Sequence, residues 1–169
     1  MEIRDYNGTG EWSRDQIEQR YRAYCAQYGI SARDLAPREH QEGPIRWVYP
    51  IMDRVIDGAK EGDLACVQLC LELIQQDQGF PFGMVLKSQA ARALRRCVGL
   101  LADGQKKLIR QRVITMLSRG YTPREFGEYA KLAKRIGMEE NIVELSAIDR
   151  SQPYVERFCR YLESEKGLA

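Results

Sequence analysis

The sequence contains one histidine, His40, and none of the short motifs that mark the common enzyme families. Ser–His or Cys–His catalysis would have to use that residue, which lies in a loop-like segment between acidic residues. The patterns GxSxG, GxGxxG and HExxH are absent, as is a phosphate-binding loop. We therefore expect a protein that is not an enzyme and has no catalytic residues. The alternative is an unrecognised site made of carboxylates that converge from distant helices.

Long apolar runs are also absent. No segment approaches the roughly 20 apolar residues that a membrane-spanning helix needs. The first residues, MEIRDYNGTGEW, are polar and do not resemble a signal peptide. These absences predict a cytoplasmic protein with no membrane partner.

The five cysteines do not form a recognisable metal or disulfide pattern. Each lies beside apolar residues in a helical pattern, which is typical of small buried thiols in a reducing compartment. Cys66 and Cys70 are four residues apart and could begin a metal site, but no further ligand is close in sequence. We expect no metal and no cofactor.

Sustained alternation of apolar and polar residues is missing, so we predict no sheet. The 169 residues, 44% hydrophobic and 30% charged, are sufficient for one globular domain. We expect a single all-α domain over 1–169 with about seven or eight helices. Its parts are a polar lead over 1–11, a first helix from Ser13 to Tyr28, a loop over 29–44 and a helical-hairpin core over 45–165.

The clearest stretch is 103–137, which predicts two helices joined by a tight turn. Asp103 is a candidate cap for the first helix, and Gly120 is suited to end it. Thr122 and Glu125 have capping-box spacing, with Pro123 at the first helical position. Apolar residues at helical spacing give each helix one buried face. The first face comprises Ile109, Val113, Met116 and Leu117, and the second Phe126, Tyr129, Ala130, Ala133 and Ile136.

Residue spacing suggests that this hairpin repeats the preceding one. Asp63, Leu69, Leu73 and Ile74 recur forty residues later as Asp103, Ile109, Val113 and Ile114. Leu94, Val98 and Gly99 recur thirty-eight residues later as Leu132, Ile136 and Gly137. A third hairpin over 139–165 fits by length.

Helical pairs at this period resemble HEAT and armadillo repeats over about 63–165. The resemblance implies a short solenoid of stacked antiparallel hairpins that binds extended partners, usually proteins and sometimes nucleic acids. It assigns no role to any residue. An irregular helical bundle is the alternative fold, because any antiparallel helical domain produces similar spacing.

Charge is distributed unevenly along the chain. The segment 87–135 has thirteen basic and three acidic residues, whereas the remainder has thirteen basic and twenty-one acidic residues. If the helices stack in sequence order, the basic residues of this segment could form one positive surface. That surface could bind phosphates or carboxylates, or it could be solvated and neutralised by the chain's own acids. The candidate anion- or nucleic-acid-binding residues are Arg92, Arg95, Arg96, Lys106, Lys107, Arg110, Lys131, Lys134 and Arg135.

The repeated helical hairpins and the absence of catalytic motifs predict a non-catalytic binding or scaffold protein. It would engage a protein partner or associate with itself. The alternative is binding of nucleic acid or another polyanion through the basic helices over 84–136. Trp47, next to Val48 and Tyr49, is expected in the core, whereas the place of Trp12 is left open between core and partner contact.

Overall fold

The computed structural model describes residues 1–76, 79 and 81–165, and most of these residues are helical. This agrees with the predicted predominance of helices, apart from one small sheet. Residue contacts are dense within two compact units, Met1–Cys97 and Val98–Ala169, which are described separately below.

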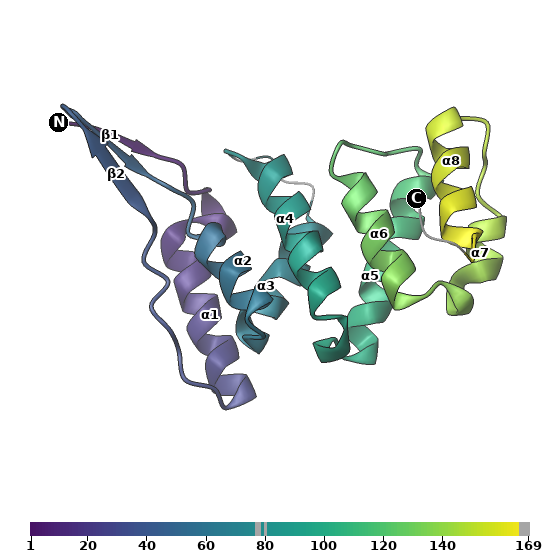
Figure 1. Ribbon diagram of the computed structural model, residues 1–169, viewed down its shortest axis with the longest axis horizontal. Helices are drawn as coiled ribbons and strands as arrows, with labels where there is room; N and C mark the ends of the chain where they lie inside the picture. Colours follow the sequence, from purple (N-terminus) through teal and green to yellow (C-terminus); the bar gives the residue numbers. More distant parts are fainter. Residues whose placement is uncertain (77–78, 80, 166–169) are drawn as a thin grey trace. The chain divides into compact units, whose positions relative to one another are not determined.

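The first unit is built around α3, a helix that is apolar on nearly all sides. It packs against α1, α2 and α4, and α2 also packs against α4 (Figure 1). Leu69, Cys70 and Leu73 on α3 are completely buried. The helices of this unit are η1 (Gly10–Trp12), α1 (Arg14–Tyr28), α2 (Met52–Lys60), α3 (Leu64–Gln75) and α4 (Gly83–Arg96).

Hydrogen bonds at Asp63 fix the start of α3. Its carboxylate accepts the backbone N–H of Cys66 at 3.0 Å, which is a helix N-cap, and the hydroxyl of Tyr21 at 2.7 Å. The Tyr21 hydroxyl in turn accepts the N–H of Arg33 at 3.1 Å. Burial raises the pKa of Tyr21, so its hydroxyl keeps the proton that it donates. One carboxylate thus links α3 to α1 and to the segment after α1.

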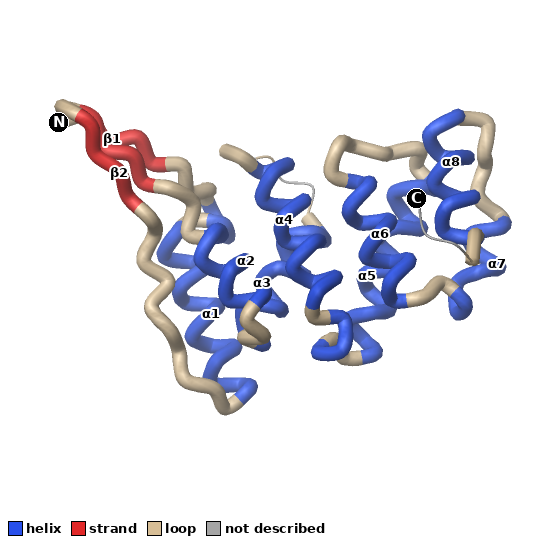
Figure 2. Tube along the Cα trace, in the orientation of Figure 1, coloured by secondary structure: helices blue, strands red, loops and turns tan. Residues whose placement is uncertain are grey.

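A three-stranded sheet precedes and interrupts these helices (Figure 2). Its strands are β1 (Glu2–Asp5), β2 (Glu39–Glu42) and β3 (Ile45–Val48), in the order β1-β3-β2. β1 runs parallel to β3, and β2 runs antiparallel to it. The prediction of no sheet was wrong, as was the helix predicted from residue 45. β1 lies within the polar lead over 1–11, β2 lies within the predicted loop over 29–44, and β3 replaces the start of the predicted helix. The strands have four residues each. β1 and β2 are exposed throughout and β3 is partly buried, and none of them shows apolar alternation.

The two tryptophans differ in their surroundings. Trp12 is buried, with the Arg20 guanidinium 4.6 Å from its ring centre. Trp47 lies half-buried on the sheet, contrary to the core position predicted for it. Its ring stacks on His40 at 5.6 Å between centroids, and the Arg4 guanidinium lies 5.9 Å from it. His40 is therefore in a strand rather than in the predicted loop.

The second unit contains the hairpin that the sequence predicted most clearly. α5 packs against α6, and α8 packs against α6 and α7. The predicted apolar face of α5 is buried at Ile109, Val113, Met116 and Leu117. The helices of this unit are η2 (Val98–Leu100), α5 (Asp103–Ser118), α6 (Phe126–Ile136), η3 (Glu139–Asn141), α7 (Ile142–Ser146) and α8 (Pro153–Glu163).

Both predicted helix starts in this hairpin were displaced. Asp103 is the first residue of α5 rather than its cap, and the Gln105 side chain accepts the N–H of Ala102 at 2.9 Å. α6 begins at Phe126, so the capping box of Thr122 and Glu125 does not form. Glu125 is itself buried at the N-terminus of α6.

An ion pair joins the segment before α8 to the end of that helix. Arg150 donates to both carboxylate oxygens of Glu163, and the bond from Nη1 to Oε2 is 2.9 Å long. These hydrogen bonds are the main reason why the pKa of Glu163 lies below its ordinary value. Burial opposes this shift only in part.

We predict that replacing Gly58 with alanine destabilises the first unit. A Cβ at Gly58 would lie 2.5 Å from the Sγ of the buried Cys66, so α2 and α3 would have to separate. Overpacking of this kind costs about 1–3 kcal/mol, which exceeds the gain in helix propensity of about 1 kcal/mol. Urea unfolding should show a lower free energy of unfolding for Gly58→Ala.

The steric cause can be tested with two further variants. Cys66→Ala in the Gly58→Ala background removes the clashing sulfur and should recover part of the loss. Gly127→Ala on α6, where an added Cβ meets no atom within 4 Å, should not destabilise the protein. A Gly58→Ala variant as stable as the parent would contradict the tight packing of α2 on α3.

We also predict a pH-dependent contribution from Glu163. Because its pKa is lowered in the folded state, the ion pair stabilises the fold above the ordinary glutamate pKa of about 4.3, and this is lost as pH falls through the folded-state pKa. Glu163→Gln should therefore lower the urea midpoint at neutral pH by an amount that disappears as the pH falls through the folded-state pKa of Glu163. The partly exposed pair limits the effect to about 1 kcal/mol.

The matched control for this measurement is Glu165→Gln. Glu165 is exposed and makes no ion pair with the described residues. Its replacement should leave the difference between neutral and acid pH unchanged. Equal effects of the two replacements would show that the contact with Arg150 does not stabilise the fold.

Candidate functional site

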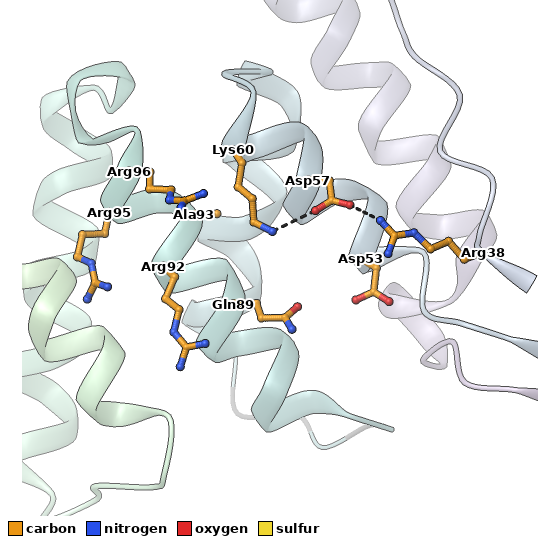
Figure 3. Close-up of a pocket in the computed structure, with 9 residues that line it drawn as sticks. All are labelled: Arg38, Asp53, Asp57, Lys60, Gln89, Arg92, Ala93, Arg95 and Arg96. Carbon is orange, nitrogen blue, oxygen red and sulfur yellow. Dashed lines mark hydrogen bonds and ion pairs between the residues drawn. The ribbon is translucent and has the colours of Figure 1, made fainter.

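The first unit contains a groove between α2 and α4, and three of the predicted site residues line it (Figure 3). Its volume is about 580 Å³. The chain reaches it from three places, namely the segment before β2, helix α2 and the second half of α4. The lining residues are Arg38, Asp53, Asp57, Lys60, Gln89, Arg92, Ala93, Arg95 and Arg96.

Helical periodicity places these side chains on the walls of the groove. Asp53, Asp57 and Lys60 are four and three residues apart and therefore share one face of α2. Gln89, Arg92, Ala93 and Arg96 have the same kind of spacing on α4. Ala93 is completely buried, and its small side chain leaves space between the two polar walls.

Asp57 is the centre of a small charge network on the α2 wall. Arg38 Nη2 lies 2.6 Å from its Oδ2, and Lys60 Nζ lies 3.0 Å from its Oδ1 (Figure 3). Asp53, one turn earlier, has a raised pKa because it is half-buried; the nearby cations Arg38 and Lys60 oppose that shift, and Asp57 adds to it. Asp57 therefore already has two cationic partners within the protein.

A second depression continues the groove along α2. It has a volume of about 380 Å³ and shares Arg38, Asp57 and Lys60 with the first. Two of its cations are engaged locally, because Arg33 pairs with Glu61 at 2.7 Å and Arg54 donates to the Ala36 carbonyl at 3.1 Å. Together the two depressions form an elongated groove rather than a closed cavity.

Arg96 is the groove cation that is best placed to receive a ligand. Its side chain is exposed, and it makes no hydrogen bond or ion pair with any residue in the described part of the chain. In Figure 3 its guanidinium points toward the side of the groove where Lys60 lies, whereas Arg95 points away. A guanidinium beside an ammonium favours a carboxylate or a phosphate. The first groove as a whole has five cations and two carboxylates.

The other six predicted residues lie in the second unit, where the chain itself engages most of them. Arg110 is buried and pairs with Glu140. Lys106 lies 3.9 Å from Asp103, and Lys131 lies 3.2 Å from Glu128.

Lys134 is held at the C-terminus of α8. Its Nζ donates to the backbone carbonyls of Tyr161, at 2.7 Å, and of Ser164. A cation stabilises the carbonyls at a helix C-terminus, and partial burial lowers the pKa of Lys134. Lys107 and Arg135 are exposed.

The residues of α2 that line the groove, and Arg38, were not identified as site residues from the sequence. The spacing of Asp53, Asp57 and Lys60 could have indicated a charged helix face. No local signal places Arg38 there, because it comes from an irregular segment that returns to α2 through tertiary contacts.

Metal and thiol chemistry have little support among the described residues. No group of three or more His, Cys, Asp or Glu side chains there is arranged to hold a metal ion. All five cysteines are free and buried, and burial raises the pKa of the Cys66 thiol, which disfavours the reactive thiolate.

The described helices include none that is both long and apolar enough to cross a membrane. In comparisons with protein-family models, with curated proteins and with solved structures, the chain matches none of them.

Proposed function

We propose that this is a non-catalytic cytoplasmic binding protein whose groove between α2 and α4 engages an acidic segment of a protein partner. The observation that carries the proposal is the exposed Arg96, which lines a groove with Lys60 and has no carboxylate partner in the described chain. A carboxylate of a partner would complete this arrangement with charge-assisted hydrogen bonds.

The mixed charge of the groove favours a peptide over a nucleic acid. Asp53 and Asp57 line it beside the cations, and Asp34 and Glu61 line its continuation. A continuous phosphate backbone would meet these carboxylates at close range, which is electrostatically unfavourable. A protein segment can place its carboxylates at Arg96 and its amides or cations near the aspartates. The elongated shape also fits an extended segment.

The proposal retains stacked helical hairpins as the architecture that presents the groove. Its support is that consecutive helices pack together within each unit, α3 with α4 and α5 with α6. The residues that suggested the repeat, Leu69 and Leu73 in one helix and Ile109 and Val113 in the other, are all buried.

We predict that Arg96→Glu weakens binding of an acidic peptide. The probe is a fluorescein-labelled peptide of alternating glutamate and glycine, measured by fluorescence anisotropy at low salt and at physiological ionic strength. Hydrogen bonds to charged groups contribute about 1.5–3 kcal/mol, so the dissociation constant should rise by about 10-fold or more. Lys107→Glu on α5 is the matched control, because it makes the same charge change at an exposed helical cation outside the groove.

The same measurement separates the two kinds of partner. If Lys107→Glu weakens binding as much as Arg96→Glu, the groove is not the site, and a diffuse attraction to the basic helices explains the data. Binding of labelled duplex DNA or RNA that is stronger than peptide binding at both salt concentrations would favour the polyanion alternative. No peptide binding at low salt would contradict the proposal.

A further inference from the structure

The outer edge of β1 exposes backbone groups that no other strand in the described part of the chain covers. β1 is at one end of the sheet, and β3 pairs with its other side. Glu2 N–H donates to the Pro44 carbonyl at 2.8 Å, and Tyr6 N–H donates to the Val48 carbonyl at 3.0 Å. Because successive residues of a strand direct their backbone groups to opposite sides, Glu2 and Arg4 face β3. Ile3 and Asp5 therefore direct their N–H and C=O groups outward.

This edge lacks three of the features that protect edge strands from pairing, although it is short and carries charged side chains. β1 contains neither proline nor lysine, and its residues pair with β3 in an unbroken register from Glu2↔Ile45 to Asp5↔Val48, without a bulge. All four of its residues are exposed, and the apolar Ile3 side chain is 57% exposed. The edge is thus open to an added strand.

Backbone geometry restricts how two copies of β1 could pair antiparallel. Opposite residues must both direct their backbone groups into the new ladder or both direct them away. A symmetric pair must therefore be centred on a residue rather than between two residues. The centre can be Glu2, Ile3, Arg4 or Asp5.

Charge selects one of these centres. Centring on Glu2, Arg4 or Asp5 places two identical charges directly opposite each other, which is destabilising. Centring on Ile3 places Ile3 opposite its own copy as a hydrogen-bonded pair. It also places Glu2 opposite Arg4 twice, once on each side of the symmetry axis.

We propose that β1 pairs antiparallel with β1 of a second copy of this chain, in the register centred on Ile3. The contact joins two three-stranded sheets edge to edge and covers the exposed Ile3 side chains. The outward N–H and C=O groups of Ile3 and Asp5 gain partners. Arg4 already contacts Glu2 of its own strand at 2.7 Å, and it gains a second carboxylate across the interface.

The opposite edge of the sheet is a poorer surface for self-association. β2, with sequence EHQE, has two glutamates and no lysine or arginine. Two copies of β2 therefore have no lysine or arginine within the strand to place opposite the glutamates. β1 combines Glu2 and Asp5 with Arg4, which permits complementary pairing.

Two readouts test the proposal on the full chain. Sedimentation velocity over a concentration series should show a monomer–dimer equilibrium. The contact is small, so we expect a weak dimer that dissociates on dilution. Ile3→Pro removes an N–H that faces away from β3, so the sheet should survive while the dimer dissociation constant rises at least 10-fold.

Charge variants test the register. Arg4→Glu places glutamates opposite each other twice and should also weaken the dimer at least 10-fold. The double variant Glu2→Arg/Arg4→Glu restores opposite charges across the axis and should recover dimerisation. Far-UV circular dichroism and thermal unfolding check that each variant remains folded.

Cross-linking gives a geometric readout. In the proposed register, Ile3→Cys places two cysteines directly opposite, with Cα atoms about 5.5 Å apart, a separation that a disulfide can span. A mild oxidant should therefore produce a covalent dimer. Arg4→Cys is the matched control, because its two copies are offset by two residues, about 7 Å along the strands, which places their Cα atoms farther apart than a disulfide can span.

Three results would overturn the proposal. These are a monomer at all concentrations, a dimer that Ile3→Pro leaves intact, and equal cross-linking of the Ile3→Cys and Arg4→Cys variants. The proposal is independent of the peptide-binding groove, because Arg96→Glu should leave the dimer unchanged and Ile3→Pro should leave peptide binding unchanged.

Discussion

Burial of α3 is the constraint on which the first unit depends. A helix that is apolar on nearly every side must be covered on every side, since each exposed apolar side chain loses its transfer free energy. The three neighbours α1, α2 and α4 provide that cover. Packing around one helix also brings α2 and α4 together, although α3 separates them in the sequence. The groove between their polar faces is thus a consequence of how the core is covered.

The basic segment serves more than one purpose. Lys134 stabilises a helix terminus, Arg110 makes a buried ion pair, and Lys106 and Lys131 pair with acids on their own helices. These contacts engage basic side chains that the sequence alone could assign only to a positive surface. At the groove, Asp57 is shared by Arg38 and Lys60, and Arg96 lies nearby without an acidic partner among the residues that the structure describes. The charges that line the groove therefore indicate a ligand more clearly than the excess of basic residues over a long segment does.

Local periodicity made the helices predictable, and tertiary pairing made the rest unpredictable. The stripe at Ile109 and Val113 is encoded within one or two helical turns, and it was found correctly. β1 pairs with a strand more than forty residues away, and its exposed residues show no alternation. Trp47 was assigned to the core because the strand around it was not recognised. Of the groove, the sequence indicated the arginines of α4 but not Asp57 or Arg38.

Exposure explains both why the sheet was missed and why its edge is available. Strands that bury one face carry an apolar pattern, whereas these strands are held by backbone pairing and by contacts such as Arg4 with Trp47. A sheet with little apolar burial of its own gains stability from every added ladder hydrogen bond and covered side chain. Extending such a sheet through β1 therefore satisfies the exposed backbone at Ile3 without disturbing the helices that form the groove.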